Sequence, residues 1–336
     1  MSNSPAPYGK QKNNGLQTFG QLSALFEERF QKRHFPAEPQ QLYDASQYLL
    51  EAGGKRIRPV MCLMANEMFD ELKEDAFEVA TAIELFHNFT LVHDDIMDRA
   101  PLRRGMPAVH ITYGEPTALL AGDVMLIAAY ESLNKIGNEY LHRILHLFNS
   151  TAKKVCEGQQ LDMEFEKSEH VNFDTYVKMI SLKTSVLLAA SLQMGAILGG
   201  AGAGNQGHLY EFGKNLGIAF QVQDDYLDAF GNPEKFGKKQ GGDIMANKKT
   251  FLWLQALEVS SPPQKAKLNE LLFRKDEPKI EEVLNIYRSC NIDGWAKQLQ
   301  QKYFSVAMKH LEEIAVVSVR KKPLEELAIY LMERDM

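Results

Sequence analysis

Two segments of the sequence, HDDIMD and QDDYLD, each place three aspartates at the same spacing. The six residues are Asp94, Asp95, Asp98, Asp224, Asp225 and Asp228. On a helix this spacing puts the first and third carboxylates of a set one turn apart, with the second beside them, so each set forms an acidic face. Carboxylates this close raise one another's pKa or bind a cation. Oxygen ligands favour a hard ion, and Mg²⁺ usually completes its shell with substrate phosphate, so the pattern predicts a diphosphate held through magnesium.

A single DDxxD on an exposed helix is usually only a solvated acidic face. This chain has two copies, and both lie among apolar residues, where an unpaired carboxylate would be unfavourable. The apolar neighbours are Leu91, Val92, Ile96, Met97, Phe220, Val222, Tyr226 and Leu227. The duplication therefore favours a functional pair of acidic faces over two solvated ones.

Basic residues complement the aspartates. The sequence GGKRIRP contains Lys55, Arg56 and Arg58, and Arg103 and Arg104 follow the first acidic set by a few residues. Arginine forks match phosphate oxygens, and lysine adds a point charge. A basic loop by itself is usually solvated surface. Beside two acidic sets, however, it predicts a pocket for a second diphosphate that is bound without metal.

Two further polar residues share a helix face with the aspartates. His87 lies seven residues, about two turns, before Asp94. Gln221 lies one turn before Asp224. A lone histidine on an apolar helix is more often a core residue, so only the face that it shares with Asp94 makes His87 a candidate site residue.

A glycine-rich stretch with two lysine pairs follows the second acidic set. It contains FGNPEKFGKKQGGD and then NKKT, and the paired lysines are Lys238, Lys239, Lys248 and Lys249. Flexible backbone with lysines predicts a lid that closes over phosphate. An exposed surface loop with solvated lysines has the same composition and stays an alternative.

Length, composition and charge fit a globular protein that does not bind nucleic acid. The chain has 336 residues, of which 45% are hydrophobic and 24% charged, and its net charge is −6. A general nucleic-acid binder needs clustered basic surface. The cysteines, Cys62, Cys156 and Cys290, show no paired spacing, which argues against a disulfide framework or a zinc site and favours a cytoplasmic location.

Apolar residues recur at steps of three and four, as in Leu209, Phe212 and Leu216, and sustained alternating runs are missing. We therefore expect an all-α protein. Residues 1–18 are polar and lack the apolar stretch of a secretory signal, so we expect a flexible tail there. No repeat or long polar linker follows, so residues 19–336 are expected to form a single helical domain.

Glycine and proline concentrate at six places, which predict breaks between helices. They are 51–58, 99–107, 114–116, 199–207, 231–242 and 260–263. The most membrane-like stretch runs from Val186 to Gly204, but it contains Gln193 and several glycines. It therefore favours a buried helix and loop, and the sequence predicts no membrane anchor.

The sequence from Leu49 to Lys249 resembles the trans-isoprenyl diphosphate synthase (polyprenyl synthetase) family. The resemblance is carried by GGKRIRP, HNFTLVHDDIMD with LRRG, AGDVML, KTSVLLAAS, and FQVQDDYLD with GKKQGGD and NKKT, in the family's order. The C-terminal part is less distinctive. The resemblance implies a single-domain helical bundle around a deep central cavity, usually a homodimer, with three Mg²⁺ between the two acidic sets.

The resemblance also implies a role for each matching position. The six aspartates would hold the metals, with Asp228 in support. The residues implied for the allylic diphosphate are Arg103, Lys183, Lys238 and Lys248. Those implied for isopentenyl diphosphate are Gly54, Lys55, Arg58, His87 and Arg104. The catalytic residues implied near the reacting carbons are Lys183, Thr184 and Gln221.

The implied activity joins isopentenyl diphosphate head to tail to an allylic diphosphate, which is dimethylallyl, geranyl or farnesyl diphosphate. Metals and lysines would neutralise the charge that grows on the departing diphosphate. The double bond of isopentenyl diphosphate would then attack the allylic cation, and the released diphosphate would take the proton. An apolar cavity would keep water from the cation.

Product length is expected to depend on the residues just before the first acidic set. Phe89 and Thr90 precede Asp94 by five and four residues, just over one turn along the helix. We expect the Phe89 ring to act as a floor for the growing chain, and Thr90 leaves more room than an aromatic residue would. The first set also lacks the two-residue insertion of many bacterial farnesyl enzymes. These features favour a C20 product over a C15 or a longer one.

Two other functions fit part of the pattern. A terpene cyclase also ionises an allylic diphosphate at a DDxxD, but it would lack the second-diphosphate pocket that GGKRIRP predicts and the second complete acidic set. A noncatalytic subunit of a heteromeric synthase would typically have lost aspartates, and all six are present here.

Overall fold

The computed structural model describes residues 16–168, 171–231, 240–272, 274, 276 and 278–333, with only the backbone at 166 and 167. The first elements are α1 (Phe19–Phe30), α2 (Gln40–Glu51), α3 (Ile57–Phe69), α4 (Glu74–Met97), β1 (Leu102–Arg103), β2 (Met106–Pro107), α5 (Val109–Tyr113), α6 (Glu115–Leu133) and α7 (Asn138–Lys167). They are followed by α8 (Phe173–Ile180), the π-helical turn η1 (Ser181–Ser185), α9 (Val186–Leu198), α10 (Ala203–Phe230), α12 (Gly242–Met245), α13 (Phe251–Val259), α14 (Pro262–Leu271), α15 (Pro278–Ser289), α16 (Ile292–Glu312) and α17 (Ser318–Glu333). The prediction of an all-α protein is confirmed. Five of the six predicted breaks fall at boundaries between described elements, and residues 232–239 of the sixth, 231–242, lie outside the described residues.

The start of the folded chain differs slightly from the prediction. Gln17 donates hydrogen bonds from its backbone N and its Nε2 to the carboxylate of Glu67, at 3.0 and 3.1 Å. Thr18 caps α1 in a reciprocal capping box with Gln21. Residues 16–18 therefore belong to the folded chain and not to a tail, and residues 1–15 lie outside the described residues.

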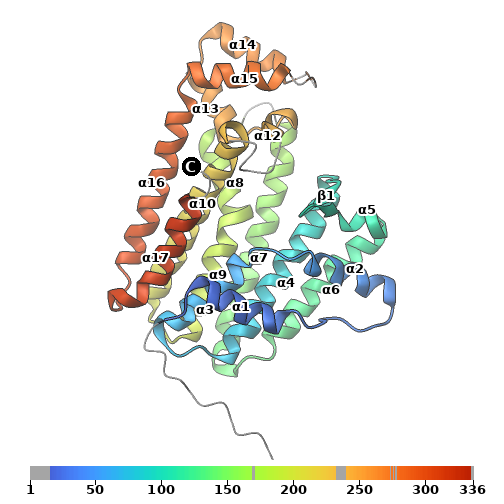
Figure 1. Cartoon of the computed structure of the whole chain (residues 1–336), viewed down its shortest axis with the longest axis vertical. Coiled ribbons are helices and arrows are strands. Elements are labelled where there is room, and N and C mark those ends of the chain that lie inside the picture. The colour runs from blue at the N-terminus through green and yellow to red at the C-terminus, as the bar shows by residue number, and fades with distance from the viewer. Residues whose placement is uncertain are drawn as a thin grey trace, which may run out of the picture.

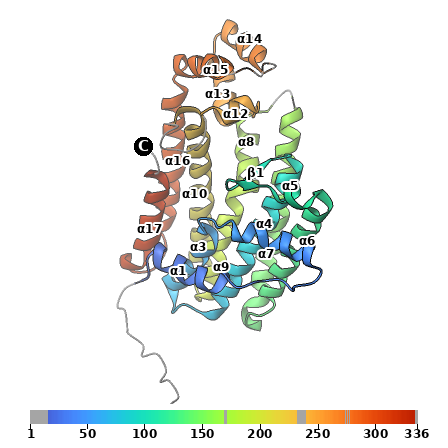
Figure 2. The same cartoon turned by 45° about the vertical axis from the view of Figure 1, so that its right-hand side comes forward.

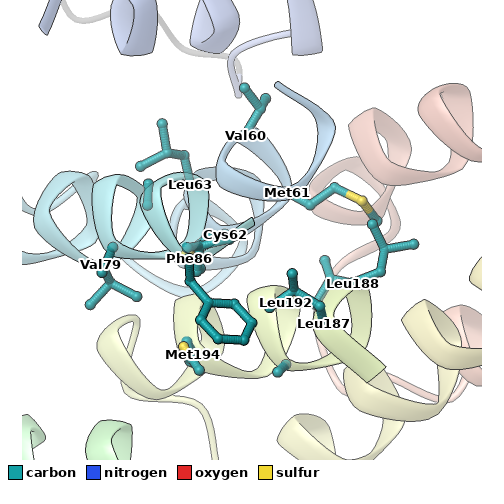
Figure 3. Packing of buried hydrophobic residues seen from close by; sticks show 14 of the residues in the cluster. Val60, Met61, Cys62, Leu63, Val79, Phe86, Leu187, Leu188, Leu192 and Met194 are labelled. Atoms are coloured by element: carbon teal, nitrogen blue, oxygen red, sulfur yellow. The ribbon is translucent and has the colours of Figure 1, made fainter. Parts of the chain in front are cut away.

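Helices α3, α4 and α9 meet at the centre of the larger of two hydrophobic clusters, where their side chains point toward one another (Figure 3). The residues labelled there are Val60, Met61, Cys62, Leu63, Val79, Phe86, Leu187, Leu188, Leu192 and Met194. Helix α9 is buried along nearly its whole length, as expected for a helix that is apolar all round.

The run Phe173–Leu198, which comprises α8, η1 and α9, is the one helical run within the described ranges that is long and apolar enough to cross a membrane. In the folded protein 72% of its apolar window is buried. Packing inside the bundle therefore accounts for its apolar character.

Helix α10 joins the two hydrophobic clusters. Leu209 and Leu216 lie in the larger cluster, whereas Ile218 and Val222, further along α10, lie in the smaller one with α8 and α12 to α16. In Figures 1 and 2, α10 runs beside α16, and α14 and α15 lie at the far end of the molecule. The second acidic set therefore stands on a helix that is held by packing on both sides.

A short hairpin between α4 and α5 was not predicted. Its strands pair antiparallel, with Leu102 opposite Pro107 and Arg103 opposite Met106. At the turn, Arg104 and Gly105 have φ values of 54° and 78°, the left-handed conformation that both central residues of a type I′ turn require. The hairpin holds both arginines close to the end of α4 and the first acidic set.

Candidate active site

A cavity of about 1430 Å³ lies among α3, α4, the hairpin, α7, α8, η1, α10 and α12. Residues far apart in the sequence line it together. The predicted site residues on its wall are Gly54, Lys55, Arg58, His87, Asp94, Asp98, Arg103, Arg104, Lys183, Thr184, Gln221, Asp224, Asp225, Asp228 and Lys248. Both acidic sets and both basic segments thus face the same space.

Lys183 bridges the first acidic set to a further carboxylate. Its Nζ lies 3.2 Å from Asp94 Oδ1 and donates a hydrogen bond to Asp162 Oδ2 at 2.6 Å. Burial disfavours the charged lysine, but Asp94 and Asp162 more than offset it and raise its pKa. Asp98, at the C-terminal end of α4, has its pKa raised to about 6 by burial and by the nearby Asp94. Asp94, Asp98 and Asp162 therefore place three carboxylates around the ammonium group of Lys183.

Asp95 takes a different position from the one expected for a residue facing a metal. It is 1% exposed, and its carboxylate accepts hydrogen bonds from Arg103 Nε at 3.0 and 3.1 Å and from Arg103 Nη2. Its side chain is not part of the cavity wall. Neighbouring residues point about 100° apart around a helix, so Asp95 can turn toward Arg103 while Asp94 faces the cavity. In this structure Asp95 holds the Arg103 guanidinium next to Asp94.

The second acidic set is held by donors from three elements. Asp225 accepts hydrogen bonds from the Tyr176 hydroxyl at 2.9 Å and from Gln221 Nε2 at 2.8 Å. Burial, and next the charge of Asp243, raise the pKa of Asp225 to about 8. Asp228 accepts a hydrogen bond from the backbone N of Asp243 at 3.0 Å, which ties it to the start of α12. A cation at this set would relieve the cost of burying the Asp225 charge.

The donor set fits magnesium that is shared with an anionic ligand. Both acidic sets offer only carboxylate oxygens, which are hard ligands. Within the part of the chain that the structure describes, no three histidine, cysteine or carboxylate side chains lie close enough to hold an ion by themselves. Oxygens of a bound diphosphate would have to complete the coordination, as is usual for Mg²⁺.

The opposite end of the cavity is basic. Arg58 Nη1 donates a hydrogen bond to His87 Nε2 at 3.1 Å, so the proton of this imidazole is on Nδ1. Burial, together with the charge of Arg58, lowers the pKa of His87 well below its ordinary value and keeps the ring neutral. Arg58 Nε is buried and has no hydrogen-bond partner among the described residues, as expected for a donor to an anionic ligand.

Arg56 and Arg104 have different roles at this end. Arg56 is buried in ion pairs with Glu27 at 2.6 Å and Glu84 at 2.5 Å, so its charge is neutralised inside the protein. Arg104 donates hydrogen bonds to the backbone oxygens of Gly53 and Leu49. The positive charge that an anion can use therefore comes from Arg104 and Arg58 rather than from Arg56.

The predicted lid can be followed only in part. Lys238 and Lys239 lie outside the described residues. Lys248 lines the cavity and is paired with Asp243 at 3.5 Å. Lys249 donates hydrogen bonds to the backbone oxygens of Phe165 at 2.9 Å and Ser168 at 2.5 Å, so it holds the end of α7.

Phe89 and Thr90 are not on the cavity wall, which differs from the expectation of a floor. The Phe89 ring packs edge-on against His93, with centroids 4.7 Å apart, and His93 Nε2 lies 3.0 Å from the backbone oxygen of Leu119 on α6. A separation of five residues rotates Phe89 about 140° around α4 from Asp94, so it points to the neighbouring helix. Thr90 Oγ1 instead donates to the His87 backbone oxygen at 2.7 Å.

Several polar residues of the cavity wall were not singled out in the sequence analysis. Among them are Glu84, Asp162, Tyr176, Asp243 and Tyr330. Asp243 stands in the GKKQGGD segment, next to a motif that was already singled out. Asp162 and Tyr176 have no partner nearby in sequence, and only their contacts with Lys183 and Asp225 reveal them. Tyr330, 63% exposed, brings the C-terminal helix α17 to the cavity.

The π-helical turn η1 presents Lys183 and Thr184 to the cavity. Such turns are rare and are often found at functional sites. Gly158 of α7 packs directly against this turn, and a Cβ at that position would lie 2.3 Å from the backbone N of Lys183. The local geometry of Lys183 therefore depends on a glycine in the neighbouring helix.

We expect Gly158→Ala to destabilise the protein by about 1–3 kcal/mol, because the added methyl group overpacks a backbone contact. Gly207→Ala is the matched control, since Gly207 lies in α10 with no atom near the new methyl group. That change should stabilise α10 by about 0.5–1 kcal/mol. Urea unfolding of both variants measures the difference, and equal unfolding midpoints would contradict the close contact at η1.

A helical cavity with two acidic sets at one end and Arg58 and Arg104 at the other is suited to binding cations together with polyanionic ligands. The polyprenyl synthetase model matches residues 39–290. The chain is 39% identical over 302 residues to a geranylgeranyl diphosphate synthase of Methanosarcina mazei, covering 88% of this chain and 91% of that protein. It is 37% identical over 314 residues to a short chain isoprenyl diphosphate synthase of Methanothermobacter thermautotrophicus, covering 93% and 96%.

The solved structures agree with this comparison. A crystal structure of a geranylgeranyl pyrophosphate synthase superposes with a TM-score of 0.90 at 40% identity, covering 96% of this chain and 100% of that one. The corresponding enzyme of Pyrococcus horikoshii superposes with a TM-score of 0.88 at 33% identity, covering 94% and 98%. The chain belongs to the polyprenyl synthetase family.

Proposed function

We propose that the protein condenses isopentenyl diphosphate head to tail with allylic diphosphates and releases all-trans geranylgeranyl diphosphate, a C20 product. One observation carries the proposal: a single cavity is lined by two acidic sets and, separately, by Arg58 and Arg104. Two diphosphates can therefore be bound at once, one through cations and one directly. The relatives named above as geranylgeranyl synthases support the C20 product.

In this proposal the aspartates hold Mg²⁺, three ions as the family resemblance implies, with the allylic diphosphate. Asp94, Asp98, Asp224, Asp225 and Asp228 line the cavity and would be the ligands, whereas Asp95 would act through Arg103. When bound, the metal would neutralise the charge that develops on the departing diphosphate.

Cationic side chains of the protein would also neutralise the charge on the departing diphosphate. Lys183, Lys248 and Arg103 already contact carboxylates of the acidic end, so they stand where donors to the allylic diphosphate are needed. Neutral His87 and the free Nε of Arg58 would hold isopentenyl diphosphate at the basic end. Apolar wall residues exclude water from the carbons between the two ends. They are Phe165, Met179, Ile180 and Phe220.

The direct test uses purified protein with radiolabelled isopentenyl diphosphate and each allylic starter in turn, with Mg²⁺ or with a chelator. We expect a C20 product by chromatography, formed only with Mg²⁺ and only when both substrates are present. Hydrocarbon formed from the allylic diphosphate alone would indicate a terpene cyclase. Absence of any product would indicate a noncatalytic subunit.

Chain length provides a second test. We propose that Phe89 limits the length of the product although it lies behind the cavity wall, because its ring packs at the interface between α4 and α6. Phe89→Ala should shift the main product beyond C20, because the emptied seam adds length for the chain. Thr90→Phe, the reciprocal change one residue later, should shift it to C15. Chromatography of the products measures both shifts. If neither variant changes the product length, Phe89 does not limit the chain.

We also propose a homodimer. Helix α6 and the neighbouring α5 expose large apolar side chains, which monomeric proteins rarely gather on one face. They are Ile111, Leu119, Leu120, Ile127 and Tyr130, each between 38% and 58% exposed. Sedimentation equilibrium of the purified chain measures the assembly directly.

A further inference from the structure

Tyr176 is a buried residue of the cavity wall to which the proposed chemistry assigns no role. It lies on α8, and its hydroxyl donates a hydrogen bond to Asp225 Oδ2 at 2.9 Å. Gln221 Nε2 donates to the other oxygen, Asp225 Oδ1, at 2.8 Å. Both oxygens of this carboxylate are therefore held, one from α8 and one from α10.

A buried tyrosine hydroxyl usually finds some partner, so the bond could be an ordinary core contact. Its surroundings favour a more specific role. Tyr176 is 7% and Asp225 5% exposed, yet both side chains and that of Gln221 border the cavity. The hydroxyl is also bonded to one of the six motif aspartates and not to a backbone oxygen, so it acts on a group of the site itself.

The bond to Asp225 also determines the orientation of Gln221. Gln221 Nε2 donates to Asp225, and a carboxylate that a bound cation keeps ionised only accepts hydrogen bonds, so the side-chain NH₂ of Gln221 has to face Asp225 when the cation is bound. The amide oxygen is then the group of Gln221 that remains for a ligand in the cavity. If Asp225 rotates, this orientation is lost with it.

We propose that Tyr176 is a positioning residue, which holds the Asp225 carboxylate, and through it the Gln221 amide, in the orientation that the bound cation and substrate require. The inference rests on the proposed metal-dependent function. Helix α8 continues directly into η1, so the same bond links the element that carries Lys183 to the helix that carries the second acidic set. Loss of such an outer partner of a metal ligand typically lowers metal affinity or activity by about 10–100-fold.

The test compares Tyr176→Phe, which removes only the hydroxyl, with Tyr226→Phe as the matched control. Tyr226 stands next to Asp225 in the same motif, but its ring packs against Phe230 and lies under Lys297, and its side chain is not on the cavity wall. Calorimetry of Mg²⁺ binding in the presence of inorganic pyrophosphate measures the site without catalysis. Steady-state kinetics and thermal unfolding are measured on the same samples.

We expect Tyr176→Phe to weaken Mg²⁺ binding and to lower kcat, each by about tenfold or more. The KM for isopentenyl diphosphate should change less than about twofold, because Arg58 and Arg104 are untouched, and Tyr226→Phe should match the wild type in all measurements. In an Asp225→Asn background, Tyr176→Phe should add less than about a twofold further loss of Mg²⁺ affinity, because the group through which it acts is already changed.

Three results would overturn the inference. One is a Tyr176→Phe variant with wild-type Mg²⁺ affinity and kcat. Another is a loss of affinity that persists in full in the Asp225→Asn background. The third is a loss that is accounted for by unfolding at the assay temperature. If the wild-type protein bound no Mg²⁺ in the presence of pyrophosphate, the proposed metal site itself would be wrong. Failure of the proposed function and failure of the inference about Tyr176 therefore give different results.

Discussion

Asp94→Ala and Asp224→Ala are each expected to lower kcat by about 10³-fold or more, which corresponds to about 4 kcal/mol of lost transition-state stabilisation. One residue lies on α4 and the other on α10, and both face the cavity. Both carboxylates would hold the proposed metals, so loss of either one would leave the charge on the departing diphosphate without full compensation.

Asp276→Ala is the matched control for both variants. Its side chain is 48% exposed and pairs with Arg274 before α15, away from the cavity wall. The radiolabelled isopentenyl assay measures turnover, and circular dichroism shows whether each variant keeps its helices. Activity within about tenfold of the wild type in a folded Asp94 or Asp224 variant would contradict the metal assignment.

Lys183→Ala is expected to lower kcat by about 10²–10³-fold, the usual loss for one electrostatic contact to a developing anion. Its ammonium group stands between Asp94 and Asp162, at 3.2 and 2.6 Å. Without the ammonium group these two carboxylates repel each other, and the departing diphosphate loses a hydrogen-bond donor. Both consequences slow ionisation of the allylic substrate.

The control for this variant is Lys214→Ala, a lysine of α10 that pairs with Glu211 and is not on the cavity wall. Single-turnover measurements with saturating substrates separate the chemical step from product release. A Lys183→Ala variant that loses only substrate affinity, with an unchanged chemical step, would show that the lysine binds substrate but does not assist departure of the diphosphate.

Much of the site could be predicted from local patterns. The steps of three and four residues identified the helices, and the repeated DDxxD spacing identified two acidic faces that the structure brings to one cavity. Basic residues quoted from GGKRIRP and LRRG reach the same cavity, except that Arg56 is neutralised by Glu27 and Glu84. The sequence pattern could not distinguish Arg56 from Arg58, because their partners lie on α1 and α4.

The sequence patterns could not supply side-chain directions or distant partners. Asp95 turns to Arg103, and Phe89 turns to His93 in the seam with α6. Asp162 and Tyr176 contribute to the site although neither belongs to a recognisable spacing. The contacts of Asp95, Asp162 and Tyr176 join residues on different elements, and spacing along one helix carries no information about them.

The sequence by itself determined the fold class, the helices and the composition of the two acidic faces, because helical periodicity and charge spacing are local properties of the chain. Only the tertiary structure decided which carboxylates face the cavity and which cations stand beside them. Those outcomes depend on the packing of α4, α7, α8 and α10 against one another. A rotation of one residue, about 100° around a helix, is enough to turn a side chain such as Asp95 from the cavity into the protein.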